Sequence, residues 1–165
     1  MTPLVIRSHP FVLAELALRE PADDEWSLDV AVRESPTVTP VIDDVATCGP
    51  FTGAVVSVAR DGGKIRMRIV GGAGRLATRV ATRYQGGPST LVQTLADLAT
   101  EAGETLPTGA AVDLPTWRVH GGSYRVETRR LAAVLGLGWR VTPSGAVDVS
   151  APRSPAGTPP GNPLA

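Results

Sequence analysis

The segment spanning residues 54–70 constrains the fold of this chain more than any other. Two runs that favour β-strands, AVVSV at 54–58 and KIRMRIV at 64–70, flank the turn sequence RDGG at 60–63. Asp-Gly and Gly-Gly steps supply the positive φ angles that a tight hairpin needs. Alternation in the second run directs Ile65, Met67 and Ile69 toward a core. The segment therefore predicts an antiparallel hairpin with a basic stripe on its outer face, made by Lys64, Arg66 and Arg68.

Shorter strand patterns lie on both sides of this hairpin. Residues 11–18 and 26–32 are two apolar runs separated by a turn at 20–25, which predicts a second hairpin. Residues 38–42 predict a short edge strand that Pro40 interrupts. Further on, the runs at 139–141 and 146–149 flank the sequence TPSG, in which Pro143 and Gly145 favour a type I turn. These runs predict a third hairpin.

Two segments carry helical periodicity. The first spans residues 88–102, opens at Pro88 or Ser89 and closes at Gly103. The second begins after its N-cap Ser123 and stops at Gly136. Its expected apolar side consists of Val126, Leu131, Val134 and Leu135. A loop is expected between the two helices, carrying Pro107, Gly109, Pro115 and Trp117. Together the patterns predict an α+β, strand-rich fold of antiparallel hairpins with two packed helices.

Length and composition divide the chain into three parts. Its 165 residues fit one domain, or one domain with a small appendage. Residues 1–50 are expected to be a strand-hairpin region belonging to the same sheet system as the β/α domain at 51–150. Residues 151–165 hold five of the 15 prolines and almost no apolar residue, which predicts a disordered Pro/Gly tail. No apolar run reaches the ~20 residues that cross a bilayer, and the N-terminus lacks signal-peptide features. We expect a protein made in the cytoplasm.

The charges are balanced in number and segregated in position. Sixteen basic and sixteen acidic residues give a net charge of zero, which argues against nucleic-acid binding driven by bulk positive charge. Acids dominate residues 15–44, and bases dominate residues 60–83. The segregation has two interpretations: two solvated faces, or head-to-tail self-association in which acidic and basic surfaces meet. The candidate interface residues are Lys64, Arg66, Arg68, Arg75, Arg79, Asp23, Asp24 and Glu25.

The motifs that could carry chemistry all have plainer structural explanations. Residues 70–77 contain G-x-G-x-x-A, the pattern of a dinucleotide-binding loop, but they follow a strand of an antiparallel hairpin and read as a bend. Cys48 is the only cysteine, and a nucleophilic pair with His9 or His120 has no local support, because Cys48 lies in the turn sequence TCGP at 47–50, which carries no protease or thiol signature. The Asp-Asp pairs at 23–24 and 43–44 lack calcium-loop spacing. We therefore expect no enzyme activity, no cofactor and no metal.

A longer pattern runs from residue 51 to residue 152. It comprises Phe51-Thr52-Gly53, the bend at 70–77, Tyr84, a helix ending at residues 99–104, Leu114-Pro115-Thr116-Trp117, Gly121-Gly122-Ser123, residues 131–141, Pro143-Ser144-Gly145 and Val147-Asp148-Val149. This run resembles the baseplate hub and tail-tip proteins of contractile-tailed phages, and their relatives in phage-like injection particles. Hub proteins of this kind are longer, and residues 1–50 match them less well.

The resemblance implies a structural protein of a virion or injection-particle tail, in which the antiparallel hairpins form small barrel-like sheets with the two helices packed outside. It implies a hub-like domain at 51–150 in a ring-like homo-oligomer, a trimer being favoured, that joins the tail tube to the spike. The expected partners are then a second copy of the chain and other tail, tube or spike proteins, with no nucleic acid and no membrane. The departures in length point to a reduced hub or a tail-terminal adaptor.

Two other functions stay open on the sequence alone. The first is a monomeric soluble module that binds peptide or carbohydrate, which exposed aromatic residues would favour. Trp26, Trp117 and Trp139 instead lie at positions expected to be in the core. The second is a small hydrolase that uses Cys48 or a carboxylate pair, which only a loss of activity in Cys48→Ser would support.

Overall fold

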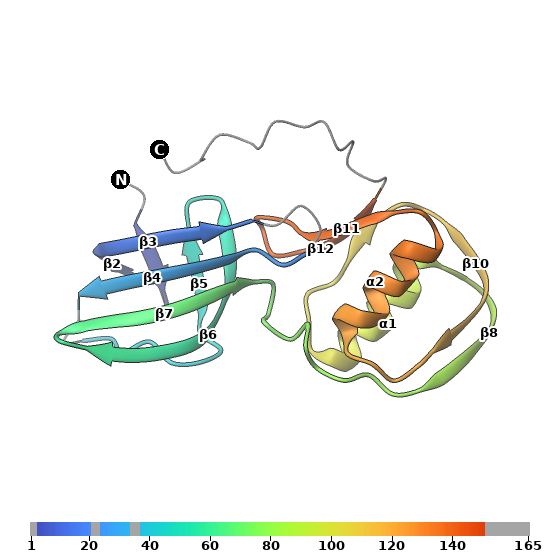
Figure 1. Cartoon of the computed structure of the whole chain (residues 1–165), viewed down its shortest axis with the longest axis horizontal. Helices are drawn as coiled ribbons and strands as arrows, with labels where there is room; N and C mark the ends of the chain where they lie inside the picture. The colour runs from blue at the N-terminus through green and yellow to red at the C-terminus, as the bar shows by residue number, and fades with distance from the viewer. Residues whose placement is uncertain (1–2, 21–23, 34–36, 151–165) are drawn as a thin grey trace.

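The computed structural model describes residues 3–20, 24–33 and 37–150. The molecule is elongated, with a β-sheet of seven strands at one end and a part that contains both helices at the other (Figure 1). The strand-rich α+β fold with two helices is confirmed. The predicted tail at 151–165 and the predicted interface residue Asp23 lie outside the described residues.

The large sheet uses the first half of the chain. All its neighbouring strands are antiparallel, in the order β2-β1-β5-β6-β7-β4-β3. Its strands are β1 (Leu4–Ile6), β2 (His9–Phe11), β3 (Leu13–Arg19), β4 (Ser27–Arg33), β5 (Val45–Cys48), β6 (Phe51–Asp61) and β7 (Lys64–Gly71). The strand β6, which begins at Phe51, therefore pairs within the same sheet as the strands that precede it.

This sheet curls without closing. The strands β2 and β3 lie at its two opposite edges, yet Val12 alone separates them in the chain. One residue spans at most ~3.6 Å, so the two edges must meet at this point. The main-chain N–H of Arg33 at the end of β4 donates to the Val12 carbonyl at 3.4 Å. The sheet is thus barrel-like, as predicted, with the seam between β2 and β3.

The hairpin that the sequence predicts most strongly is present. The strands β6 and β7 pair from Gly53↔Gly71 to Asp61↔Lys64, and the turn residues Gly62 and Gly63 have φ angles of 55° and 79°. The alternate residues Ile65, Met67 and Ile69 are buried. The second predicted hairpin is also present, because β3 pairs antiparallel with β4.

The short strand predicted at residues 38–42 is wrong. A tight turn forms at residues 41–44 instead. In this turn the Asp44 N–H donates to the Val41 carbonyl at 3.2 Å, and the Asp44 carboxylate accepts from the Val41 N–H at 2.8 Å. Asp43 has a positive φ of 73°, which Asp tolerates better than most residues. The strand at this place, β5, begins only at Val45 and was not predicted.

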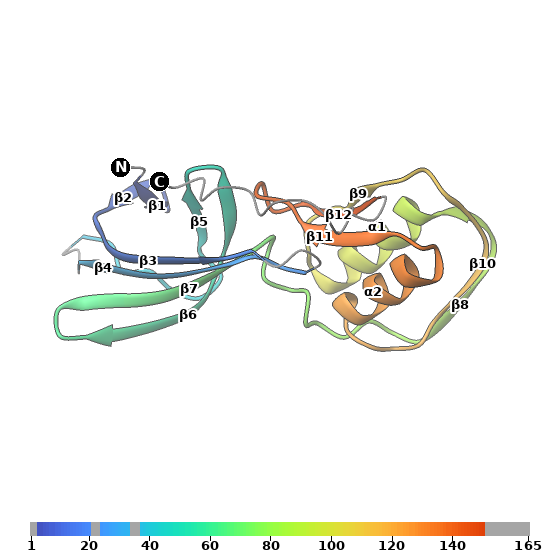
Figure 2. The same cartoon turned by 45° about the horizontal axis from the view of Figure 1, so that its top comes forward.

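The second half of the chain packs two helices between smaller sheets. Its elements are β8 (Arg83–Thr90), α1 (Leu91–Ala102), β9 (Thr108–Gly109), β10 (Asp113–Val119), α2 (Tyr124–Val134), β11 (Gly138–Val141) and β12 (Val147–Ser150). The strands β8 and β10 form an antiparallel ribbon, and β12 pairs antiparallel with β11 and parallel with β9. Figures 1 and 2 show both helices lying between the ribbon and the three-stranded sheet.

The helix α1 starts later than the sequence suggests. The prediction placed its start at Pro88 or Ser89, but both residues belong to β8. The N-cap is Thr90, whose hydroxyl accepts from the Gln93 N–H while the Gln93 side chain accepts from the Thr90 N–H. This reciprocal capping box fixes the start of the helix. Gly103, with φ of 72°, ends it as predicted.

The ends of α2 are confirmed, but its predicted apolar side is partly wrong. Ser123 caps the helix by accepting from the Val126 N–H at 3.3 Å. The side chains of Val126 and Val134 are 52% and 67% exposed, although they were assigned to the core. The buried positions are Tyr124, Glu127, Thr128, Leu131 and Ala132. The hydrophobic pattern of the sequence does not reveal the buried face of α2, because Glu127 and Thr128 are polar yet point into the core.

The loop predicted between the helices contains two strands instead. Pro115 lies in β10, where the pairing with β8 shifts between Leu114 and Thr116. A bulge of this kind tolerates a residue without an N–H, so proline does not prevent the strand. The last hairpin, β11 and β12, is confirmed, and its turn has the Gly145 N–H donating to the Thr142 carbonyl at 2.9 Å.

Candidate interaction surface

The outer face of the large sheet carries the predicted basic stripe. Strand register places Ala31 and Ala59 on either side of Arg66, and Asp29 and Ser57 on either side of Arg68. The small residues leave room between the charged side chains. An open groove of about 600 Å³ results, and its charged lining residues are Glu15, Asp29, Arg66 and Arg68.

Much of this stripe is already neutralised within the chain. Glu15 on β3 lies 3.1 Å from Lys64 Nζ and 3.3 Å from Arg66 Nη1. Arg66 also contacts Asp61 through its Nε at 3.2 Å. The hydrogen bond from Lys64, together with the positive charges of Arg66 and Lys64, lowers the pKa of the Glu15 carboxyl. Residues of the acidic and the basic segments of the sequence therefore form ion pairs with each other within one sheet of a single chain.

Two of the predicted basic residues keep their charge uncompensated. Arg68 Nη2 donates to Ser27 Oγ at 3.4 Å, and Arg79 Nη2 donates to the Gly121 carbonyl at 3.4 Å. Neither guanidinium has an ion-pair partner among the residues that the structure describes. These two side chains are the best remaining cationic groups for a contact with another chain.

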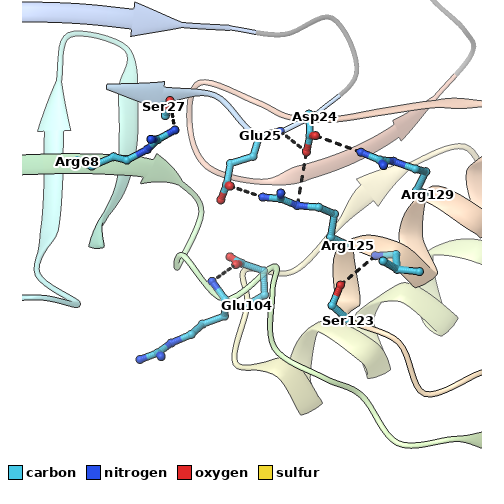
Figure 3. A network of polar contacts seen from close by, with 10 residues as sticks. Asp24, Glu25, Ser27, Arg68, Glu104, Ser123, Arg125 and Arg129 are labelled. Atoms are coloured by element: carbon cyan, nitrogen blue, oxygen red, sulfur yellow. Dashed lines mark hydrogen bonds and ion pairs between the residues drawn. The ribbon is translucent and has the colours of Figure 1, made fainter. Parts of the chain in front are cut away.

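The predicted acidic residues Asp24 and Glu25 bind the helix α2 instead of lying free (Figure 3). Arg129 Nη2 lies 3.1 Å from Asp24 Oδ2, and Arg125 Nε lies 3.6 Å from Asp24 Oδ1. The other end of the Arg125 guanidinium pairs with the Glu25 carboxylate. Two carboxylates just before β4 thus hold two arginines of α2, which ties the large sheet to the helical part.

Burial gives Glu25 an unusual pKa. Its side chain is only 13% exposed. Loss of solvent raises the pKa of the Glu25 carboxyl to about 7, although the Arg125 charge acts in the opposite direction. The nearby carboxylates of Glu104 and Asp24 raise the pKa further. Proton uptake by Glu25 therefore falls in a range where exposed carboxylates are fully ionised.

Glu104 occupies the glycine-rich bend. Its carboxylate accepts from the main-chain N–H groups of Ala73 at 2.5 Å and Arg75 at 2.7 Å, and from Thr105 N–H at 2.8 Å. Gly72 has a φ of 75°, and a Cβ there would lie 2.4 Å from Glu104 Oε1. The amides that a dinucleotide-binding loop would offer to a phosphate are therefore taken by a protein carboxylate. The bend leaves an antiparallel strand and precedes no helix, so the predicted interpretation as a plain bend is confirmed.

Arg75 joins the bend to the first sheet. Its Nη2 lies 2.8 Å from Asp43 Oδ2, in the turn before β5. Of the eight predicted interface residues, Asp24, Glu25, Lys64, Arg66 and Arg75 thus form ion pairs inside the chain. Sequence reasoning missed Glu104, Arg125 and Arg129. The separation of 29 to 31 residues between Glu104 and its bend left no local signal for that contact.

The indole of Trp26 completes the junction between the two parts. It is 1% exposed, donates from Nε1 to the Thr142 carbonyl at 2.8 Å and packs edge-on against Phe51 with ring centroids 5.0 Å apart. The Val141 N–H donates to the Asp24 carbonyl, and the Thr52 N–H donates to the Pro143 carbonyl. The final hairpin is therefore fixed to the large sheet by main-chain and side-chain bonds.

The alternative chemical sites find plainer roles. Cys48 is buried on β5 opposite Phe51, and this burial raises the pKa of its thiol. Asp44 pairs with Arg7, whose Nε lies 2.6 Å from Oδ1. No group of three or more His, Cys, Asp or Glu side chains suited to a metal ion occurs among the described residues. No helix in that part of the chain has the length and apolar character needed to cross a bilayer.

The aromatic side chains mostly lie inside. Trp26 and Trp139 are buried, as predicted, while Trp117 is partly buried, with the Arg130 guanidinium 4.8 Å from its ring centroid. Tyr84 on β8 is 71% exposed. A row of exposed rings of the kind that stacks on sugars is not formed by the three tryptophans.

Comparison with known proteins gives the class of fold. No family model and no curated protein matches the chain. Among solved structures, the 43 kDa tail protein of prophage MuSo2 from Shewanella oneidensis aligns over 90% of this chain and 53% of its own length, with 13% identity and a TM-score of 0.67. A tail protein from Neisseria meningitidis MC58 aligns over 90% and 49%, with 14% identity and a TM-score of 0.64.

A third tail protein shares the fold. The prophage tail protein gp18 from Listeria monocytogenes EGD-e aligns over 90% of this chain and 50% of its own, with 12% identity and a TM-score of 0.57. The chain therefore has a fold that phage and prophage tail proteins of three bacteria also have. It spans about half the length of these proteins.

Proposed function

We propose that this chain is a structural, non-catalytic component of a phage or phage-like contractile tail. Within the tail we place it at the baseplate hub, or at a tail-tip adaptor that joins tube and spike. The observation that carries the proposal is the fold match over 90% of the chain to three separate tail proteins. The resemblance in residues 51–152 supports the same class from the sequence side.

The contacts between the large sheet and the helical part support a structural role. Two parts of the elongated chain are joined by the buried Trp26 indole and by the pairs of Asp24 and Glu25 with Arg125 and Arg129. Contacts of this kind hold two parts in one relative orientation, because each side chain loses its partners if the parts move. A subunit of a tail must transmit force between its neighbours, which such a junction allows.

We further propose a ring-like homo-oligomer, with a trimer favoured, that contacts other tail, tube or spike proteins. Five of the eight predicted interface residues are already paired within the chain, so they offer less to a neighbour. Arg68 and Arg79 donate hydrogen bonds to Ser27 and Gly121 and form no ion pair with another described residue. The exposed side chains of Val126 and Val134 on α2 add apolar area for such a contact. A ring contact would combine such apolar and cationic groups.

Localisation on particles tests this proposal. The chain would carry an epitope tag on its N-terminus in cells that produce the particle, and gold-labelled antibody would be imaged on purified particles by electron microscopy. We expect label at one end of each tail, where tube and spike meet. Label distributed along the tube, or particles that lack the chain, would exclude a hub or tip role.

A further inference from the structure

The strand β3 leaves one edge of the large sheet open. One side of β3 pairs with β4 from Leu13↔Val32 to Arg19↔Ser27, and no described strand pairs with its other side. Most of its side chains are exposed, and Leu16 is 37% exposed. Val12, just before it, is 71% exposed. Unpaired main-chain groups on a strand of seven residues form a template for another strand.

Every other sheet edge in the described residues carries a feature that blocks pairing. The edge strand β2 has three residues and contains Pro10, and β8 contains Pro88 with two glycines. The strand β10 contains Pro115 at a bulge. The strands β9 and β11 have two and four residues. Proline, short length and bulges are the usual means by which proteins protect sheet edges. The strand β3 contains neither proline nor glycine, and its one bulge, between Leu13 and Glu15, leaves the stretch from Glu15 to Arg19 regular.

We infer that β3 pairs antiparallel with β3 of a second copy of this chain, and so joins two seven-stranded sheets across a two-fold axis. Since β3 is the unprotected edge of each copy, its natural partner is the same edge. The sequence of the strand is also self-complementary. With Ala17 on the axis, Glu15 lies opposite Arg19 of the second copy, and Leu16 lies opposite its Leu18.

The two faces of β3 suit this register. Glu15 and Arg19 share the outer face of the sheet, because their partners on β4 are Ala31 and Ser27. Their side chains are 51% and 73% exposed; Glu15 also contacts Lys64 and Arg66 within the chain, and Arg19 has only a loose pair with Asp29, at 3.9 Å. On the inner face, Leu16 and Leu18 lie opposite Val30 and Leu28, which are buried. The paired edges would therefore extend the core and add two cross-strand ion pairs.

This contact goes beyond the proposed ring. A two-fold contact cannot close a three-fold ring, so it would join two subunits, or two rings, face to face. The two proposals can consequently fail separately.

The mass of the full chain over a dilution series tests the β3 contact. In sedimentation equilibrium, Leu16→Lys should weaken the two-fold association about tenfold or more, because a lysine on an edge strand opposes pairing and the symmetric contact carries the change twice. The matched control is Leu106→Lys, which adds the same charge at another exposed leucine, outside β3, and should leave this association unchanged. A wild-type chain without any two-fold species, or a Leu16→Lys variant that associates as the wild type does, overturns the inference.

A charge reversal tests the register. Arg19→Glu places two acids opposite each other at both ends of the contact and should weaken association. The double variant Glu15→Arg with Arg19→Glu restores opposite charges and should recover it. Failure of the double variant, when circular dichroism shows it folded, overturns the register with Ala17 on the axis.

Hydrogen exchange separates this contact from the ring. Amides in β3 should gain protection as the concentration of the wild-type chain rises, and Leu16→Lys should abolish that gain. A trimer whose β3 amides exchange equally at all concentrations overturns the β3 contact and leaves the tail assignment standing.

Discussion

Two groups of charged side chains in this molecule differ in burial. On the outer face of the large sheet, Glu15, Lys64 and Arg66 form ion pairs while their side chains stay between 43% and 51% exposed. At the junction, Glu25 is 13% exposed and Glu104 is buried. Exposed pairs contribute little to stability, whereas a buried carboxylate must keep its partners. We therefore expect substitutions of the charged residues at the junction to destabilise the contact between the two parts of the chain, and substitutions on the sheet face to have little effect on stability.

The largest effect should come from Glu104→Ala. The change removes the acceptor of the part-buried N–H groups of Ala73 and Arg75, and each such group left unsatisfied costs about 1–3 kcal/mol. We expect the free energy of unfolding to fall by about 4 kcal/mol in urea titrations. The control is Asp97→Ala on the exposed side of α1, the helix that ends just before Glu104, and this change should affect stability much less. Equal effects of the two variants would show that Glu104 does not fasten the bend.

The next effect is a pH dependence that Glu25 imposes on stability. The carboxyl has a pKa of about 7 in the folded protein and near 4.5 when unfolded, so the folded protein binds more protons between these values. The contribution of Glu25 to the free energy of unfolding should therefore be greatest below pH 4.5 and should fall as the pH rises to 7. The loss is up to about 3 kcal/mol.

Comparison with Glu25→Gln isolates this contribution from that of the other titrating groups. The difference in unfolding free energy between the wild type and the variant should change across pH 4.5–7. A difference that stays constant over this range would contradict the raised pKa.

A smaller loss is expected from Arg129→Ala. Its side chain is 58% exposed, and its guanidinium pairs with Asp24, which Arg125 also contacts. Because Asp24 keeps one partner, the cost should be about 0.5–1 kcal/mol in thermal or urea unfolding. A loss as great as that of Glu104→Ala would place the junction's main contact at Arg129 instead.

The smallest effect should come from Arg66→Gln on the sheet face. Solvent screens this pair with Glu15, so the midpoint of urea unfolding should stay the same within error. The pKa of Glu15, followed by NMR, should move up toward its usual range because one of the two cations that lower it is gone. A clear loss of stability would show that the exposed network acts like the junction.

Local rules allowed much of the fold to be predicted from the sequence. The glycines at 62 and 63, the cap Ser123 and the C-terminal Gly103 each act on neighbouring residues, so the β6–β7 hairpin and the helix ends could be located. Alternation also identified which residues of β7 face the core. These signals depend on a few consecutive residues, and the structure confirms them.

Contacts between distant segments could not be predicted in this way. Pairing with β10 makes a strand of residues 83–90, which otherwise carry two glycines and a proline. The segregated charges suggested contacts between subunits, but Asp24 and Arg129 meet within the chain across 105 residues. Nothing near Glu104 in the sequence indicates that it binds the bend. The sequence thus identified several charged residues of the candidate surface, but the residues that pair with them inside the chain depend on the tertiary fold and could not be predicted.

The mass of the purified full chain, measured by light scattering at low and moderate salt, tests most directly whether the protein is an assembly subunit. One chain has a mass of 17.1 kDa. We predict a trimer, or a species of six chains if β3 edges also pair. Moderate salt should loosen it only slightly, since most of the charges pair within each chain. A mass of one chain at every concentration and salt would contradict the account.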